Sequence, residues 1–192
     1  GNREFALARR GCHHGGNGAG DGIGVRAGLC RCHRRAGGAG RDVPRLGISV
    51  SETPQRILWY FADPMCSWCW GFAPVISAIR DSYADRVKIA LMLGGLRPGT
   101  TGPMTAKGRE EILQHWRDVQ RMTGQPFAFE GALPGGFVYD TEPPSRAVIA
   151  VGEIRPEEVF PYFKSVQEAF YAHGRNVTRP DTLADLAEQH NI

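Results

Sequence analysis

Two cysteines separated by two residues are the part of this sequence best suited to chemistry. Cys66 and Cys69 lie in the run DPMCSWCWGF, residues 63–72 of a chain of 192 residues. Exchange between thiols and disulfides needs one sulfur that is ionised near neutral pH. It also needs a second sulfur close enough to displace a substrate bound to the first. The spacing of the pair therefore predicts a redox-active dithiol.

The segments around the pair predict a strand, a helix and a second strand. Residues 57–62 (ILWYFA) form a short apolar and aromatic run, typical of a strand buried on both faces. Apolar residues recur at helical spacing over residues 69–83, and residues 87–93 again resemble a strand, closed by Gly94 and Gly95. The crossover is long enough for the two strands to be parallel, which predicts an α/β fold.

This order places the first cysteine at the start of a helix. Unpaired backbone N–H groups and the positive end of the helix dipole favour an anion there. Cys66 is therefore the expected nucleophile. Cys69, one turn further along, is expected to remain a thiol and to resolve the mixed disulfide.

After Gly95 the pattern is wholly helical. Four helices are expected: one that ends at Gly124, one that follows Pro143-Pro144, one from Pro156 to Gly174, and one from Thr178 to Gln189.

Three other residues near the cysteines have two interpretations each. Asp63 could influence proton transfer, but an Asp before Pro at a strand end more often forms a turn, which we favour. Trp68 and Trp70 could form an aromatic rim that holds substrates, and we expect one of them to pack inside instead.

A zinc site is the main alternative chemistry for the pair. It requires two more ligands. His115, His173 and His190 each stand alone on a predicted helix, so we expect no metal at Cys66 and Cys69.

Residues 1–50 differ sharply from the rest in composition. They hold 13 of the 25 glycines, nine arginines and three acidic residues, a net charge of +6, whereas the other residues carry −3. Arginines scattered among glycines are weak evidence for a nucleic-acid partner, and we expect none. The thiols and imidazoles of this segment match no familiar zinc-finger spacing; they belong to Cys12, His13, His14, Cys30, Cys32 and His33.

Targeting signals are absent from the sequence pattern. No apolar run approaches the roughly 18 residues needed to cross a bilayer, and the first 30 residues lack the apolar core of a signal peptide. We therefore expect a cytoplasmic protein with no membrane partner. Five cysteines are too few for a disulfide scaffold, which favours a chemical role for the pair.

The run at residues 63–72 resembles the active-site stretch of DsbA-like proteins in the thioredoxin superfamily. Pro74 stands where those proteins place a proline in the active-site helix, and residues 94–99 and 139–143 resemble further segments of the same branch. The resemblance extends over residues 56–192. It implies a thioredoxin-like fold with a βαβ start and an all-helical insertion that caps the dithiol.

The composition of residues 1–50, which show no helical or alternating pattern, and the resemblance over residues 56–192 together predict the domain organisation. Residues 1–50 are expected to be a disordered or non-native tail, with the natural start hypothesised at Val50. Residues 51–96 would form the first βαβ half of the thioredoxin-like domain, and residues 97–192 the helical insertion. The second half of the fold, with two strands, a last helix and a cis-proline, is not found. We therefore expect a C-terminally truncated chain that folds poorly and exchanges disulfides weakly.

The leading function hypothesis is a thiol-disulfide oxidoreductase or isomerase that acts on protein dithiols, or on small thiols and disulfides. It would use Cys66 and Cys69 as catalytic residues and no bound cofactor. A glutathione-dependent isomerase or transferase is the second hypothesis, because kappa-class transferases and 2-hydroxychromene-2-carboxylate isomerases share the inserted fold. Those enzymes generally lack the second cysteine, so Cys69 argues against them. The third hypothesis is a module that binds a soft metal or a partner without turnover.

Overall fold

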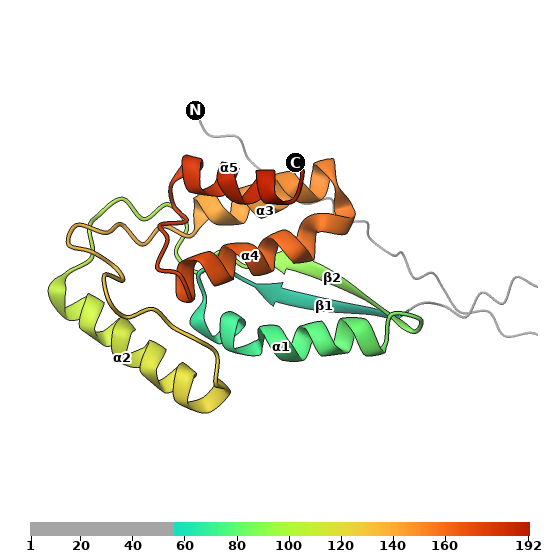
Figure 1. Cartoon of the computed structure of the whole chain (residues 1–192), viewed down its shortest axis with the longest axis horizontal. Coiled ribbons are helices and arrows are strands. Elements are labelled where there is room, and N and C mark those ends of the chain that lie inside the picture. Colours follow the sequence, from blue (N-terminus) through green and yellow to red (C-terminus); the bar gives the residue numbers. More distant parts are fainter. Residues whose placement is uncertain (1–55) are drawn as a thin grey trace, which may run out of the picture. The chain divides into compact units, whose positions relative to one another are not determined.

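The computed structural model describes residues 56–192 (Figure 1). The predictions for residues 1–50, including the start at Val50, lie outside this range and stay predictions. The described elements are β1 (Arg56–Ala62), α1 (Ser67–Ser82), β2 (Val87–Leu93), α2 (Ala106–Thr123), α3 (Glu142–Ile154), the 3-10 turn η1 (Pro156–Glu158), α4 (Val159–Tyr171) and α5 (Pro180–Gln189).

The predicted strand, helix, strand order is confirmed. β1 and β2 are parallel, with Arg56 opposite Val87 and Ala62 opposite Leu93. Helix α1 is the crossover between them, as a parallel pair requires. Every described element after residue 96 is helical. The expected domain boundary at that residue stays a prediction.

The sequence predicted that residues 57–62 form a strand buried on both faces. The strand is confirmed, but its predicted burial is wrong. Ile57, Trp59 and Phe61 are 54%, 55% and 69% exposed. Within the described residues β2 is the only strand that pairs with β1. A run of apolar residues predicts a strand from local preference, whereas burial depends on which elements cover it.

The helices pack around α1 and α4. Helix α1 contacts α2 and α4, and α4 also contacts α3 and α5. Figure 1 shows α3 and α5 on the side of α4 that is opposite α1. No helix of residues 56–192 has both the length and the hydropathy to span a membrane.

An aromatic cluster forms the centre of the core. The buried ring of Trp116 on α2 lies 5.5 Å from Phe127, 5.5 Å from Phe170 and 5.0 Å from Tyr171, measured between ring centroids. At Gly71 the helices come so close that a Cβ atom would lie 2.9 Å from side-chain carbons of Val119 and Thr123. A glycine is therefore required where α1 crosses α2.

The ends of the helices follow local signals in the sequence. The Thr105 side chain caps α2 by accepting a 3.0 Å hydrogen bond from the backbone N–H of Gly108. Gly124, with φ of +73°, ends the same helix where the sequence predicted. Helix α3 begins one residue before the predicted prolines, at Glu142.

Candidate active site

Cys66 occupies the N-cap position of α1, directly before the first helical residue. This confirms its predicted place at the start of the helix. Cys69 lies one turn further along the same helix. Both thiols are free and partly buried.

The surroundings of the pair shift the pKa values of the two thiols in opposite directions. The hydrogen bond from the Cys69 thiol lowers the pKa of Cys66 to about 6, and the backbone N–H groups of Cys69 and Trp68 assist. Burial and the nearby charge of Asp63 act in the opposite direction but are outweighed. The hydrogen bond to Cys66, followed by burial, raises the pKa of Cys69. Near neutral pH the arrangement thus favours a thiolate at Cys66 and a thiol at Cys69.

The loop before Cys66 is held by a buried carboxylate. One oxygen of Asp63, Oδ1, accepts a 2.7 Å hydrogen bond from the backbone N–H of Met65, which is the turn favoured by the sequence. The other oxygen accepts a 2.7 Å bond from the backbone N–H of Leu96, in the loop after β2. Asp63 therefore joins the loops that follow both strands.

The two segments that resembled DsbA-like proteins outside the cysteine run meet beside this loop. The backbone N–H of Arg97 donates to Thr141 Oγ1 at 2.9 Å, and the N–H of Thr141 donates to the carbonyl oxygen of Arg97 at 3.2 Å. The Tyr139 hydroxyl donates to the carbonyl oxygen of Met65 at 2.6 Å. Residues far apart in the sequence thus fix the backbone just before Cys66.

Tyr60 is a candidate site residue that sequence reasoning missed. Its hydroxyl is buried and makes no hydrogen bond of standard geometry among the described residues. The Cys69 sulfur nevertheless lies near enough to this hydroxyl to shift its pKa. Burial and the interaction with Cys69 both raise the pKa of Tyr60, which stays protonated as a potential donor. The available signal was a single hydroxyl within the apolar run of residues 57–62.

The two tryptophans differ in burial, and one of them packs inside, as expected. Trp68 is 42% exposed and meets the ring of His115 edge-on, with centroids 5.8 Å apart. Trp70 is 3% exposed, stacks on Tyr171 at 6.3 Å and donates from Nε1 to the Pro126 carbonyl oxygen at 3.0 Å. Trp68 alone of the two remains available at the surface near the sulfurs.

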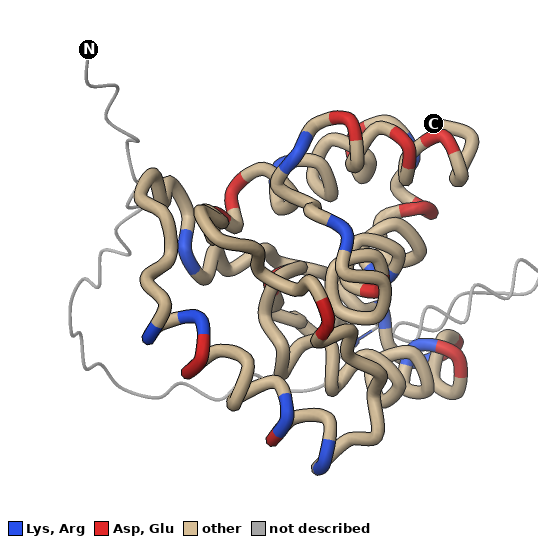
Figure 2. Tube along the Cα trace, turned by 60° about the vertical axis from the view of Figure 1, so that its left-hand side comes forward, with Lys and Arg blue, Asp and Glu red and all other residues tan. Residues whose placement is uncertain are grey.

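The described part of the chain contains neither a cluster of metal-ligating side chains nor a concentration of like charges. No group of three or more His, Cys, Asp or Glu side chains within residues 56–192 is arranged to hold a metal ion. Figure 2 shows basic and acidic residues interspersed along the helices. On α2 they form ion pairs such as Arg121–Asp118 at 2.9 Å and Arg117–Glu110 at 3.2 Å.

Comparison with solved structures gives close matches to disulfide-handling proteins. A candidate protein disulfide isomerase from Nitrosomonas europaea is 49% identical, with a TM-score of 0.68, over 72% of this chain and 66% of that one. This chain belongs to the DsbA-like proteins of the thioredoxin fold. The cytosolic disulfide reductase DsbM from Pseudomonas aeruginosa matches this DsbA-like chain with 27% identity and a TM-score of 0.62, over 70% of the chain and 64% of DsbM.

Curated relatives of the DsbA-like chain are more distant. The ClpXP adapter protein SpxH of Halalkalibacterium halodurans is 24% identical over 142 residues, 70% of this chain and 45% of that protein. SpxH of Shouchella clausii is 21% identical over 130 residues, 68% of this chain and 42% of that protein. The DsbA-like chain thus spans less than half of these relatives and about two thirds of the solved structures. No protein-family model matches it.

Proposed function

We propose that this DsbA-like chain exchanges thiols and disulfides through Cys66 as nucleophile and Cys69 as resolving cysteine. The observation that carries the proposal is the environment of Cys66. Its sulfur stands at the N-terminus of α1 and receives hydrogen bonds that lower its pKa to about 6. Such a sulfur is largely a nucleophilic thiolate at neutral pH.

The reaction proceeds in two exchange steps. The Cys66 thiolate attacks one sulfur of a substrate disulfide and forms a mixed disulfide, and the other substrate sulfur leaves as a thiolate. Cys69 then gives up its proton and attacks the Cys66 sulfur. A Cys66–Cys69 disulfide forms and the second substrate sulfur is released. The substrate gains two electrons, the dithiol loses two, and the proton from Cys69 passes to a released thiolate. The reverse sequence oxidises a substrate dithiol.

The expected substrates are protein dithiols and disulfides, with small thiols as exchange partners. One solved form of the relative DsbM contains GSH, which supports glutathione as such a partner here. The name of DsbM as a cytosolic reductase supports a cytoplasmic location for the proposed activity.

Trapping of the mixed disulfide tests the assignment. The full reduced chain is incubated with glutathione disulfide. The mass of the peptide that contains both cysteines is then measured by mass spectrometry. Wild type is expected to form the internal disulfide, whereas a Cys69→Ala variant accumulates glutathione on Cys66. A Cys66→Ala variant is expected to yield little of either product. Equal, slow modification of both cysteines, as in the urea-unfolded chain, would contradict the proposal.

The same preparations separate the other hypotheses. A glutathione-dependent isomerase or transferase would retain glutathione binding and turnover in a Cys69→Ser variant, without a mixed disulfide as intermediate. A binding module, the class to which the adapter name of SpxH points, would leave Cys66 unreactive. Stoichiometric zinc or copper in freshly purified protein would favour a metal-binding role.

A further inference from the structure

An arginine lies at the same end of the sheet as the cysteines. Because β1 and β2 are parallel, their carboxyl ends lie side by side. The loop after β1 leads to Cys66, and the loop after β2, residues 94–99, contains Arg97. Ligands of open α/β sheets bind at this edge, outside the carboxyl ends of the strands. Arg97 is therefore a candidate for contact with a substrate bound to Cys66.

Hydrogen bonds fix the backbone of Arg97 relative to the loop before Cys66. Its N–H donates to Thr141 Oγ1 at 2.9 Å, and its carbonyl oxygen accepts from the Thr141 N–H at 3.2 Å. The N–H of the preceding residue, Leu96, donates to Asp63 at 2.7 Å. The same carboxylate holds the turn that leads to Cys66. The two loops are therefore held together by their backbones.

The side chain of Arg97 is also restrained. Its guanidinium lies over the ring of Tyr139, with Cζ 5.3 Å from the ring centroid. Tyr139 is buried, and its hydroxyl donates to the carbonyl oxygen of Met65, directly before Cys66. A cation that rests on a fixed ring has less conformational entropy to lose when it binds an anion. The charge of Arg97 is thus held next to the segment that presents the nucleophile.

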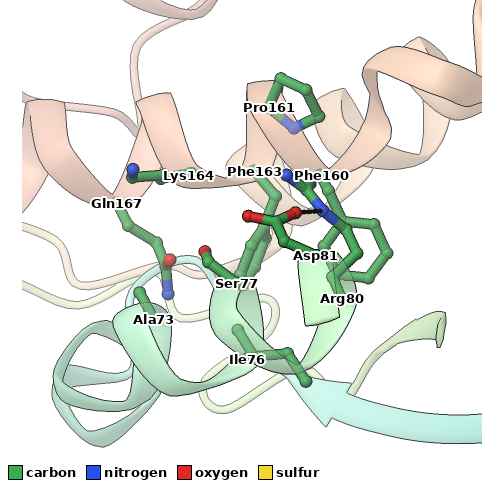
Figure 3. Close-up of a pocket in the computed structure, with 10 residues that line it drawn as sticks. All are labelled: Ala73, Ile76, Ser77, Arg80, Asp81, Phe160, Pro161, Phe163, Lys164 and Gln167. Carbon is green, nitrogen blue, oxygen red and sulfur yellow. Dashed lines mark hydrogen bonds and ion pairs between the residues drawn. The ribbon is translucent and has the colours of Figure 1, made fainter. Parts of the chain in front are cut away.

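The Arg97 side chain is exposed and forms no ion pair with an acidic side chain of residues 56–192. Arg80 is a useful contrast, because it too lies over a ring, with Cζ 5.8 Å from the Phe160 centroid. It lines a cavity of about 290 Å³ between α1 and α4 (Figure 3). Asp81 pairs with Arg80 there, with Nε and Oδ1 3.2 Å apart. An anion from solution can bind Arg97 without displacing such a partner.

The carboxylates near Arg97 are bound to backbone groups. Asp63 is buried, and both of its oxygens accept backbone hydrogen bonds. Asp140 Oδ1 accepts from the N–H of Gly99 at 2.8 Å and from the N–H of Glu142 at 3.1 Å. The guanidinium is therefore the charged group that this loop offers to a ligand.

Glutathione has the chemistry that this arrangement would recognise. It carries two carboxylates, each only a few bonds from its sulfur. A guanidinium binds a carboxylate through two parallel hydrogen bonds, which fixes both position and orientation. The solved form of DsbM that contains GSH supports this class of substrate for the chain.

We propose that Arg97 binds a carboxylate of glutathione during exchange at Cys66. This inference rests on the proposed exchange function and adds a residue that selects the substrate. The Cys66 thiolate attacks glutathione disulfide, the sulfur–sulfur bond of the substrate breaks, one glutathione stays on Cys66 and the other leaves as a thiolate. Arg97 holds the glutathione that stays and takes part in no bond that forms or breaks.

A comparison of two disulfides tests this role. Loss of the reduced Cys66 thiol in the full chain is followed by quenched mass spectrometry, with glutathione disulfide or with uncharged bis(2-hydroxyethyl) disulfide. The ratio of the two rate constants should fall about 3–10-fold in Arg97→Gln. Arg97→Lys keeps the charge without the two parallel donors, so its ratio should lie between the two. Because salt screens exposed charges, about 0.5 M NaCl should lower the wild-type ratio more than that of Arg97→Gln.

Arg80→Gln is the matched control. It removes another guanidinium that lies over a ring, at the opposite end of α1 from the cysteines, and should leave the ratio unchanged. An unchanged ratio in Arg97→Gln would overturn the proposal. So would equal slowing with both disulfides, which is the result of a purely structural role. If Cys66 of wild type reacts with neither disulfide, the exchange function itself is rejected, and the role of Arg97 with it.

A third disulfide distinguishes glutathione from acidic protein substrates. The disulfide of acetyl-Asp-Cys-amide carries a carboxylate beside the cysteine but has neither the glycine nor the γ-glutamyl group. A smaller effect of Arg97→Gln on this peptide than on glutathione disulfide is expected and supports the proposal. An equal or larger effect would show that Arg97 recognises acidic protein segments, and the assignment to glutathione would be wrong.

Discussion

The Tyr139 hydroxyl donates a 2.6 Å hydrogen bond to the carbonyl oxygen of Met65, the residue immediately before Cys66. Both residues are buried, and 74 positions of sequence separate them. This bond fastens the segment between α2 and α3 to the backbone that presents the proposed nucleophile. It therefore connects the stability of the helical region with the geometry of the thiol.

Tyr139→Phe should affect both properties. Loss of the hydrogen bond leaves the Met65 carbonyl unpaired and is expected to lower the free energy of unfolding by about 1–2 kcal/mol, measured by urea denaturation. Alkylation of Cys66 should also change, because the loop before it is less restrained. Tyr162→Phe is the matched control: its hydroxyl donates to the Leu183 carbonyl oxygen at 2.9 Å, away from the cysteines. It should cost similar stability and leave Cys66 unaffected. Equal alkylation rates in both variants would contradict the proposed connection.

The reactivity of Cys66 should depend on pH in a defined way. Because the folded pKa is about 6, below the ordinary value for a thiol, the thiolate persists at neutral pH and is lost as the pH falls through 6. The rate of iodoacetamide alkylation at Cys66, followed by peptide mass spectrometry, should be half-maximal near pH 6. In Cys69→Ala the midpoint should rise, since the hydrogen bond that contributes most is removed. A wild-type midpoint near that of the unfolded chain, about 8.5, would refute this.

Tyr60→Phe should slow the second exchange step selectively. The Tyr60 hydroxyl favours the ionised form of Cys69, although the net shift of the Cys69 pKa is upward. Its removal is expected to slow release of glutathione from the mixed disulfide by a factor on the order of 3–10. Stability should change little, because the hydroxyl makes no hydrogen bond of standard geometry while Cys69 is a thiol. Stopped-flow measurement of glutathione release checks the rate. Cys66 alkylation serves as the internal control, and unchanged release would remove Tyr60 from the site.

The two tryptophans should respond differently to truncation. Trp70→Ala removes a buried ring and a hydrogen bond to Pro126, and a loss of about 3–5 kcal/mol in unfolding free energy is expected. Trp68→Ala removes a partly exposed ring and should cost less, about 1 kcal/mol. If Trp68 contacts substrates, this variant should still weaken the reduction of insulin disulfides. Similar stability losses in the two variants would show that Trp68 packs as Trp70 does.

Local sequence signals predicted much of the scaffold correctly. The parallel strand, helix, strand unit, the end of α2 at Gly124 and the place of Cys66 at the start of α1 all follow from periodicity, capping and spacing. These signals act over a few residues, so they can be read without knowledge of the fold.

Other features of the site depended on which distant residues the fold brings together. The bond from Tyr139 to Met65, the bond from Leu96 to Asp63 and the approach of Tyr60 to Cys69 join separate elements. The exposure of β1, predicted wrongly, is also a property of its neighbours. The sequence alone determined that a dithiol begins a helix. Only the tertiary structure decided which buried groups surround it, because burial and long-range hydrogen bonds arise from packing between elements.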